Sequence, residues 1–110
     1  VRTAATNNIK VAFRGRTAHA GNAPWEGRSA LKAAELFGIG IQFMREHVLP
    51  TARIHYVYES AGSAPNVVPD FAQVWIVIRD LDREKVAALT DWAREIAEGA
   101  ALMTETTAEF

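Results

Sequence analysis

The sequence has no cysteine, almost no net charge and no long apolar run. The absence of cysteine excludes disulfide bonds and thiolate metal sites, and it fits a reducing compartment, so we expect a cytoplasmic protein. A net charge of −1 provides no field that would attract a polyanion, and we therefore expect no nucleic-acid partner. Without a charged and apolar leader or the ~20 apolar residues that a bilayer requires, we expect a soluble chain with no membrane partner.

Motifs for self-contained catalysis are also lacking. The histidines His19, His47 and His55 are far apart, and none has the His-X-Asp or His-Glu-X-X-His spacing of a metal site. A metal hydrolase needs several such ligands and a carboxylate base, and neither a Gly-X-Ser-X-Gly elbow nor a phosphate-binding loop is present. We therefore predict no metal site in this chain, and we interpret His47, near a helix end, and His55, inside a strand, as structural residues.

The first half of the sequence has the pattern of a strand followed by a helix. Residues 9–13 alternate between large apolar and other side chains, which predicts a strand that Gly15 ends. Ser29 is a suitable N-cap for a helix that continues to about His47 and stops before Pro50, because the residue before a proline avoids helical angles.

The second half has two strands, a helix and the start of another strand. Residues 53–59 and 71–79 are rich in β-branched and aromatic side chains. Asp82 caps a helix that runs through about Met103, and residues 106–110 begin a fourth strand. The order β-α-β-β-α-β predicts an α+β, ferredoxin-like fold: a four-stranded antiparallel sheet with two helices on one face.

The two predicted helices differ in how their apolar residues are spread. The second has one apolar stripe opposite charged residues, as expected for a helix packed on a sheet. The first also has apolar residues outside its main stripe: Leu31, Leu36, Ile39 and Phe43. Either Gly38 and Gly40 let this helix approach the sheet inside a thick core, or it has a second buried face at a subunit contact. The second or the fourth strand can also expose an edge for pairing.

Two polar loops contain the residues best suited to binding an anion. His19 lies among alanine and glycine, so its imidazole is accessible and can donate to an oxyanion if its tautomer is fixed. Asn66 follows Pro65, and Arg79 ends a strand with a planar fork that suits a carboxylate. Each residue also has a simpler interpretation: a solvated histidine, a turn asparagine and an arginine paired with a surface aspartate.

The same loops resemble a known family. The runs Thr17-Ala18-His19-Ala20-Gly21, Pro24-Trp25-Glu26-Gly27-Arg28 and Ala64-Pro65-Asn66-Val67-Val68-Pro69-Asp70 are similar to the dimerisation domain, or lid, of the M20 metallopeptidases and amidohydrolases. The resemblance covers nearly the whole chain. Within the family, the Pro-Trp-Glu-Gly-Arg run and residues 92–104 are most similar to the B-type subunit of the aminobenzoyl-glutamate hydrolases.

The resemblance implies that residues 1–110 form one lid domain inserted into a larger catalytic domain that holds two divalent metal ions, usually zinc. Two subunits would pair through this domain as a homodimer. The reaction implied is hydrolysis of an amide bond next to a free carboxylate, in an aminobenzoyl-glutamate-like or N-acyl amino acid substrate. His19 would reach a neighbouring subunit's active site and polarise the scissile carbonyl, while Asn66 and Arg79 would bind substrate. The fragment alone would be inactive.

Two departures from the family pattern affect the second loop. Ala61 stands where many relatives have glycine, and Val67 stands where many have arginine. Two other functions stay open: a stand-alone ferredoxin-like module that binds a small acid, and an oligomerisation element whose loops are ordinary turns.

Overall fold

The computed structural model describes residues 5–110 and has the predicted order of elements. The strands are β1 (Ala5–Arg14), β2 (Arg53–Ser60), β3 (Phe71–Asp80) and β4 (Thr107–Glu109), and the helices are α1 (Ala30–Met44) and α2 (Arg83–Thr104). Short 3-10 turns occupy Pro24–Glu26 and Arg45–His47. Helix α1 therefore ends at Met44, and only a tighter turn continues to His47, where the sequence predicted one continuous helix.

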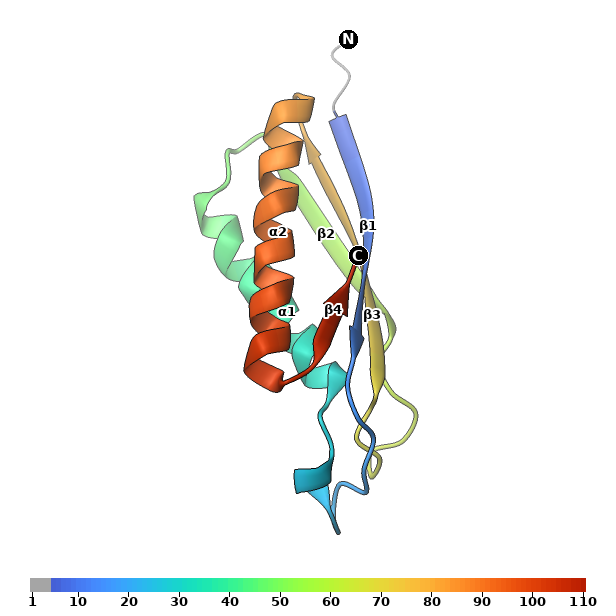
Figure 1. Ribbon diagram of the computed structural model, residues 1–110. Helices are drawn as coiled ribbons and strands as arrows, with labels where there is room; N and C mark the ends of the chain where they lie inside the picture. The colour runs from blue at the N-terminus through green and yellow to red at the C-terminus, as the bar shows by residue number, and fades with distance from the viewer. Residues whose placement is uncertain (1–4) are drawn as a thin grey trace.

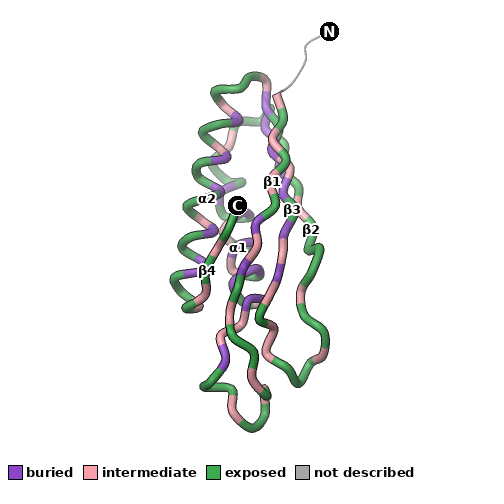
Figure 2. Tube along the Cα trace, turned by 45° about the vertical axis from the view of Figure 1, so that its right-hand side comes forward, coloured by how far each residue is buried: buried purple, intermediate pink, exposed green. Residues whose placement is uncertain are grey.

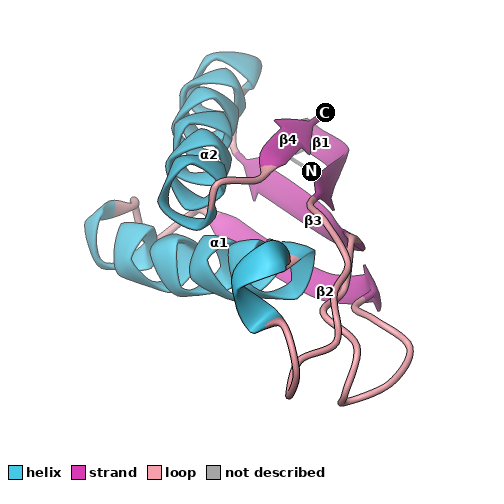
Figure 3. Ribbon diagram, turned by 60° about the horizontal axis from the view of Figure 1, so that its bottom comes forward, coloured by secondary structure: helices cyan, strands magenta, loops and turns pink. Residues whose placement is uncertain are grey.

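The four strands form one sheet in the order β2-β3-β1-β4, and every neighbouring pair is antiparallel. Both helices cover the same face of this sheet, and the other face is open (Figures 1 and 3). This arrangement confirms the predicted ferredoxin-like fold. The edges of the sheet are β2, with eight residues, and β4, with three.

The core lies between the helices and the inner face of the sheet (Figure 2). Strand β3 shows the expected alternation, because Val74, Ile76 and Ile78 are fully buried while Trp75 and Arg79 face outward. Burying a side chain such as Ile76 stabilises the fold by roughly 1.5–3 kcal/mol. The two faces of the sheet therefore have separate roles, one for packing and one available for contacts.

Both predicted N-caps are present. The Ser29 hydroxyl accepts a hydrogen bond from the backbone N–H of Lys32 at 3.2 Å, and the Asp82 carboxylate accepts from that of Lys85 at 2.9 Å. The Lys85 side chain also donates to Asp82 and holds the pKa of this carboxyl below its usual value. These caps fix where each helix begins, as their sequence positions predicted.

The two glycines of α1 make different close approaches. A Cβ atom on Gly38 would lie 2.9 Å from the hydroxyl of Tyr56, so this glycine lets α1 approach β2, in agreement with the first of the two alternatives for this helix. A Cβ on Gly40 would lie 2.5 Å from the Ile96 side chain, so the close approach of this glycine is to α2 and not to the sheet. The side chains of Ile39 and Phe43 stay exposed, at 49% and 72%.

Among residues 5–110, neither helix has the length and apolarity to span a bilayer.

Candidate functional site

Three chain segments meet at the loop side of the sheet, where β1 ends and β3 begins. Gly15 donates its backbone N–H to Asp70 O at 2.8 Å, and Arg16 and Arg28 exchange two backbone hydrogen bonds at 2.8 Å each. A Cβ atom on Gly15 would lie only 2.0 Å from the carbonyl oxygen of Arg28. A glycine is therefore needed at position 15 to close the base of the first loop.

The two loops predicted to carry chemistry lie side by side beyond this base. Ala20 donates its N–H to Asn66 O at 3.0 Å, and Val68 donates to Ala18 O at 2.9 Å. These bonds flank His19 and Val67, which form an isolated antiparallel bridge. In such a pair the Cα atoms are about 4.5 Å apart, so the structure brings His19 next to the Asn66 loop.

The imidazole of His19 is held in one orientation by its own loop. Its Nδ1 accepts hydrogen bonds from the backbone N–H groups of Gly21, at 3.1 Å, and Asn22, at 3.0 Å. An acceptor Nδ1 carries no proton, so the proton of the neutral ring is on Nε2. The side chain is exposed, and this tautomer offers an N–H donor to a group outside the domain.

Asn66 occupies a tight turn. The N–H of Val67 donates to Ala64 O at 3.2 Å, with Pro65 and Asn66 as the central residues. Asn66 does not have a positive φ, which excludes a type II turn. Gly62 takes the positive φ of this loop, at 119°, and Ala61 has no positive φ, so the alanine is compatible with the loop.

Arg28 ties the His19 loop to the end of α2. Its guanidinium donates to Glu105 at 2.8 Å and to the backbone oxygens of Trp25 and Gly27 at 3.1 and 2.6 Å. Glu105 is the C-cap of α2 and has a left-handed backbone. Sequence reasoning missed this tie, because the two residues are 77 positions apart. The only signal was the position of Arg28 inside the Pro-Trp-Glu-Gly-Arg run.

Arg79 is not near these loops. It lies on the open face at the opposite end of β3, eight residues beyond Phe71. At ~3.3 Å per residue, a strand of this length separates Arg79 from the loop end by about 26 Å. The structure therefore brings His19 and Asn66 together and separates both from Arg79 within one protomer.

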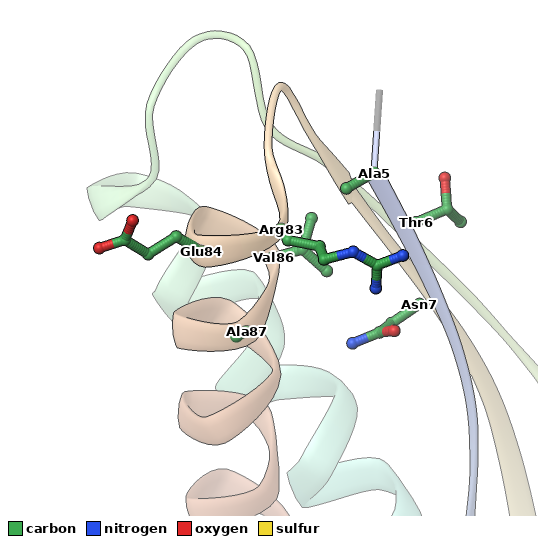
Figure 4. Close-up of a pocket in the computed structure, with 7 residues that line it drawn as sticks. All are labelled: Ala5, Thr6, Asn7, Arg83, Glu84, Val86 and Ala87. Atoms are coloured by element: carbon green, nitrogen blue, oxygen red, sulfur yellow. The ribbon is translucent and has the colours of Figure 1, made fainter. Parts of the chain in front are cut away.

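Two hollows on the surface lie at different places relative to these residues. A cavity of about 580 Å³ lies between the start of β1 and the start of α2, far from His19, and is lined in part by Asn7, Arg83 and Glu84 (Figure 4). A hollow of about 300 Å³ adjoins the Asn66 loop, between Leu31, Gly62 and Pro65. Within residues 5–110, no group of three histidine, cysteine or acidic residues is placed to hold a metal ion.

His47 stacks on Trp92, with ring centroids 6.4 Å apart.

Comparisons with known proteins agree on one family. A family model described as the peptidase dimerisation domain, of the M20 type, matches residues 2–104. The B-type subunit of the p-aminobenzoyl-glutamate hydrolase of Escherichia coli K12 is 46% identical over 109 residues, which are 98% of this chain and 23% of that protein. The Xaa-Arg dipeptidase of Mus musculus is 30% identical over 106 residues, or 96% of this chain and 25% of that protein.

A solved structure shares the same fold. The aminobenzoyl-glutamate utilization protein from Klebsiella pneumoniae superposes with a TM-score of 0.88 at 32% identity, over 96% of this chain and 27% of that one. The chain thus spans about a quarter of the length of these relatives. The match over nearly all of its residues shows that the chain belongs to the peptidase dimerisation domain family of the M20 enzymes.

Proposed function

We propose that this domain is the dimerisation and substrate-capping lid of an amidohydrolase that cleaves an amide bond next to a free carboxylate. The observation that carries the proposal is the fixed Nε2–H tautomer of His19, set by two backbone donors on Nδ1. A relative at 46% identity is named as part of a p-aminobenzoyl-glutamate hydrolase, which supports this substrate class. A larger catalytic domain of the same protein would carry the metal ions, usually zinc in this family, and they would activate the attacking water.

His19 is suited to stabilise charge on the scissile carbonyl. Hydrolysis of an amide develops negative charge on the carbonyl oxygen, and a preorganised N–H donor stabilises that charge in the transition state. The ring does not need to reorient, because Gly21 and Asn22 already hold it. Losing such a donor costs roughly 2.7–4 kcal/mol of transition-state stabilisation.

Asn66 and Arg79 are suited to bind the substrate. The amide of Asn66 can donate to a carboxylate or accept from an amide N–H, and the Arg79 guanidinium can bind a carboxylate through two hydrogen bonds. Because about 26 Å of strand separates the two ends of the domain, one small substrate cannot contact both His19 and Arg79 of the same protomer. We therefore propose that His19 of one protomer and Arg79 of the other serve one active site.

The proposed homodimer would form along β2 and the exposed side of α1. Strand β2 is a long edge, whereas β4 has only three residues, too few for extended pairing. On the helical side of the sheet, the exposed side chains of Ile39 and Phe43 and the partly exposed Tyr58 supply an apolar surface. Two β2 strands related by a two-fold axis run antiparallel, which directs the His19 end of one protomer toward the Arg79 end of the other.

Complementation between two inactive variants tests the proposal. In the full-length enzyme, His19→Ala and Arg79→Gln homodimers should each lose at least about 99% of the activity toward p-aminobenzoyl-glutamate. Heterodimers of the two variants should regain activity, because one of their two sites keeps both native residues. Full activity of the His19→Ala homodimer would instead favour a domain that only holds subunits together, and heterodimers without activity would contradict the shared site.

A further inference from the structure

The open face of the sheet has a different charge balance at its two ends. Toward the loop end, each cation has an acidic partner: Lys10 lies 3.4 Å from Glu59, and Arg14 forms an ion pair with Glu109. Hydrogen bonds from Gln73 and Lys10 hold the pKa of Glu59 below its usual value, so this carboxylate is charged at neutral pH. The positive charges of this half are therefore compensated.

At the far end, two arginines face each other without such compensation. Arg53 of β2 and Arg79 of β3 are directly opposed in the register, so their side chains leave the same face of the sheet, and both are exposed. Among the residues that the structure describes, neither forms an ion pair with a carboxylate. The adjacent Asp80 is buried on the helical side, where it accepts a hydrogen bond from Thr51 at 2.7 Å.

Arg53 is partly fixed by its surroundings. One terminal nitrogen, Nη1, donates to the backbone oxygens of Pro50, at 2.7 Å, and Ala52, at 2.8 Å. The described contacts leave Nε and Nη2 available to a ligand. The stem of Arg53 therefore stays at the strand end, and part of its fork stays available.

The third strand completes the row with a neutral donor. Thr6 of β1 is the register partner of Arg79 on its other side. Figure 4 shows the side chain of Thr6 pointing away from that of Asn7, which faces α2. The row Arg53, Arg79 and Thr6 thus holds two positive charges and a hydroxyl on one face. Like charges directly opposed on neighbouring strands destabilise a sheet, and a bound dianion removes that cost.

We propose that Arg53 is a second carboxylate-binding residue, which with Arg79 selects amides of dicarboxylic amino acids such as glutamate. The inference rests on the proposed function, in which Arg79 binds the carboxylate next to the scissile amide. Arg53, on the neighbouring strand about 4.8 Å away, would then bind the side-chain carboxylate. Removing that carboxylate from the substrate leaves Arg53 without a ligand.

The test compares two substrates with one acyl group in the full-length enzyme. Wild type should cleave p-aminobenzoyl-glutamate with a kcat/KM about ten- to hundredfold higher than p-aminobenzoyl-glutamine, the usual range for a charge-assisted hydrogen bond. Arg53→Gln should abolish most of this preference by lowering only the glutamate value, and Arg53→Lys should restore part of it. Lys10→Gln removes a paired cation from the same face and should leave the preference unchanged.

The p-aminobenzoyl-glutamine substrate is also the control for structural damage by the Arg53→Gln substitution. If Arg53→Gln lowers kcat/KM for both substrates equally, Arg53 acts only on the structure, and the inference is overturned. Equal cleavage of both substrates by wild type overturns the inference and leaves the proposed function intact. Failure of wild type to cleave either substrate overturns both.

Discussion

The two ends of the sheet position their candidate site residues by different means. At the loop end, His19 is oriented by backbone N–H groups, by Gly15 and by the paired segments around residues 16 and 28. At the other end, Arg53 and Arg79 share a face simply because they occupy opposed positions on regular strands. The arrangement of His19 depends on backbone geometry, and that of the two arginines depends mainly on side-chain identity. Substitutions should separate the two.

The largest effect should come from the histidine itself. His19→Ala in the full-length enzyme should lower kcat about a hundredfold or more, because it removes an oriented donor to the oxyanion. The metal content, measured by elemental analysis, should not change. His47→Ala is the matched control, since this histidine stacks on Trp92 outside the site. A kcat within twofold of wild type for His19→Ala would remove this residue from the mechanism.

The second-largest effect should come from a substitution that displaces the backbone at the loop end of the sheet. Gly15→Ala places a Cβ 2.0 Å from Arg28 O, so the base of the loop must shift. We expect a loss of about 3 kcal/mol in the free energy of unfolding, the upper end of the range for overpacking, together with a reduced kcat. Denaturant unfolding of the 110-residue chain measures the first quantity.

Gly99 provides the matched control for that experiment. A Cβ on Gly99 meets nothing within 4 Å, and the residue lies inside α2. Gly99→Ala should therefore stabilise the chain by roughly 0.5–1 kcal/mol, because alanine is the better helix former. Equal destabilisation by the two substitutions would show that the loop base has no special dependence on glycine.

At the Arg79 end of the sheet, a change of side chain should alter substrate binding and leave the stability of the fold unchanged. Arg79→Lys keeps the charge and loses the planar fork, so we expect KM to rise about tenfold in the full-length enzyme. The melting temperature should not change, because the side chain is exposed and the described structure gives it no ion pair. An unchanged KM would place the carboxylate-binding site elsewhere.

The smallest effect concerns the tie between Arg28 and Glu105. Glu105→Gly removes a surface ion pair worth about 0–1 kcal/mol, and it also relieves a left-handed backbone that costs a side chain roughly 1–2 kcal/mol. The free energy of unfolding should therefore stay equal or rise slightly. Glu105→Asn, which tolerates the same backbone, separates the two contributions. A clear loss of stability in both variants would show that the ion pair is worth more than usual for an exposed pair.

Much of this architecture could be predicted from local patterns. The alternation in β1 and β3 and the caps Ser29 and Asp82 determined the element types, and the turn residues placed both loops at strand ends. The separation of Asn66 from Arg79 was not predicted, although eight of the twelve residues between them belong to β3. The resemblance had suggested one substrate for both, and the length of β3 shows that a single protomer cannot provide this.

Other features could not be predicted because they depend on backbone atoms brought together only by the fold. The donors to Nδ1 of His19 are amide groups that every non-proline residue has, so no residue type announces them. The pairing of Arg28 with Glu105 needs the end of α2 to return to the first loop. The opposition of Arg53 and Arg79 required the exact register of β2 against β3.

The contact between Arg28 and Glu105 links the opening of two distant segments. If the last turn of α2 unfolds locally, the Arg28 guanidinium loses one of its three acceptors, and the 3-10 turn before it loses an anchor. The amide protons of Glu26 and Gly27, which close this turn, would then exchange with solvent together with those at the end of α2. Because an exposed ion pair is weak, this coupling would be modest and would reach the turn that follows His19 and not the imidazole itself.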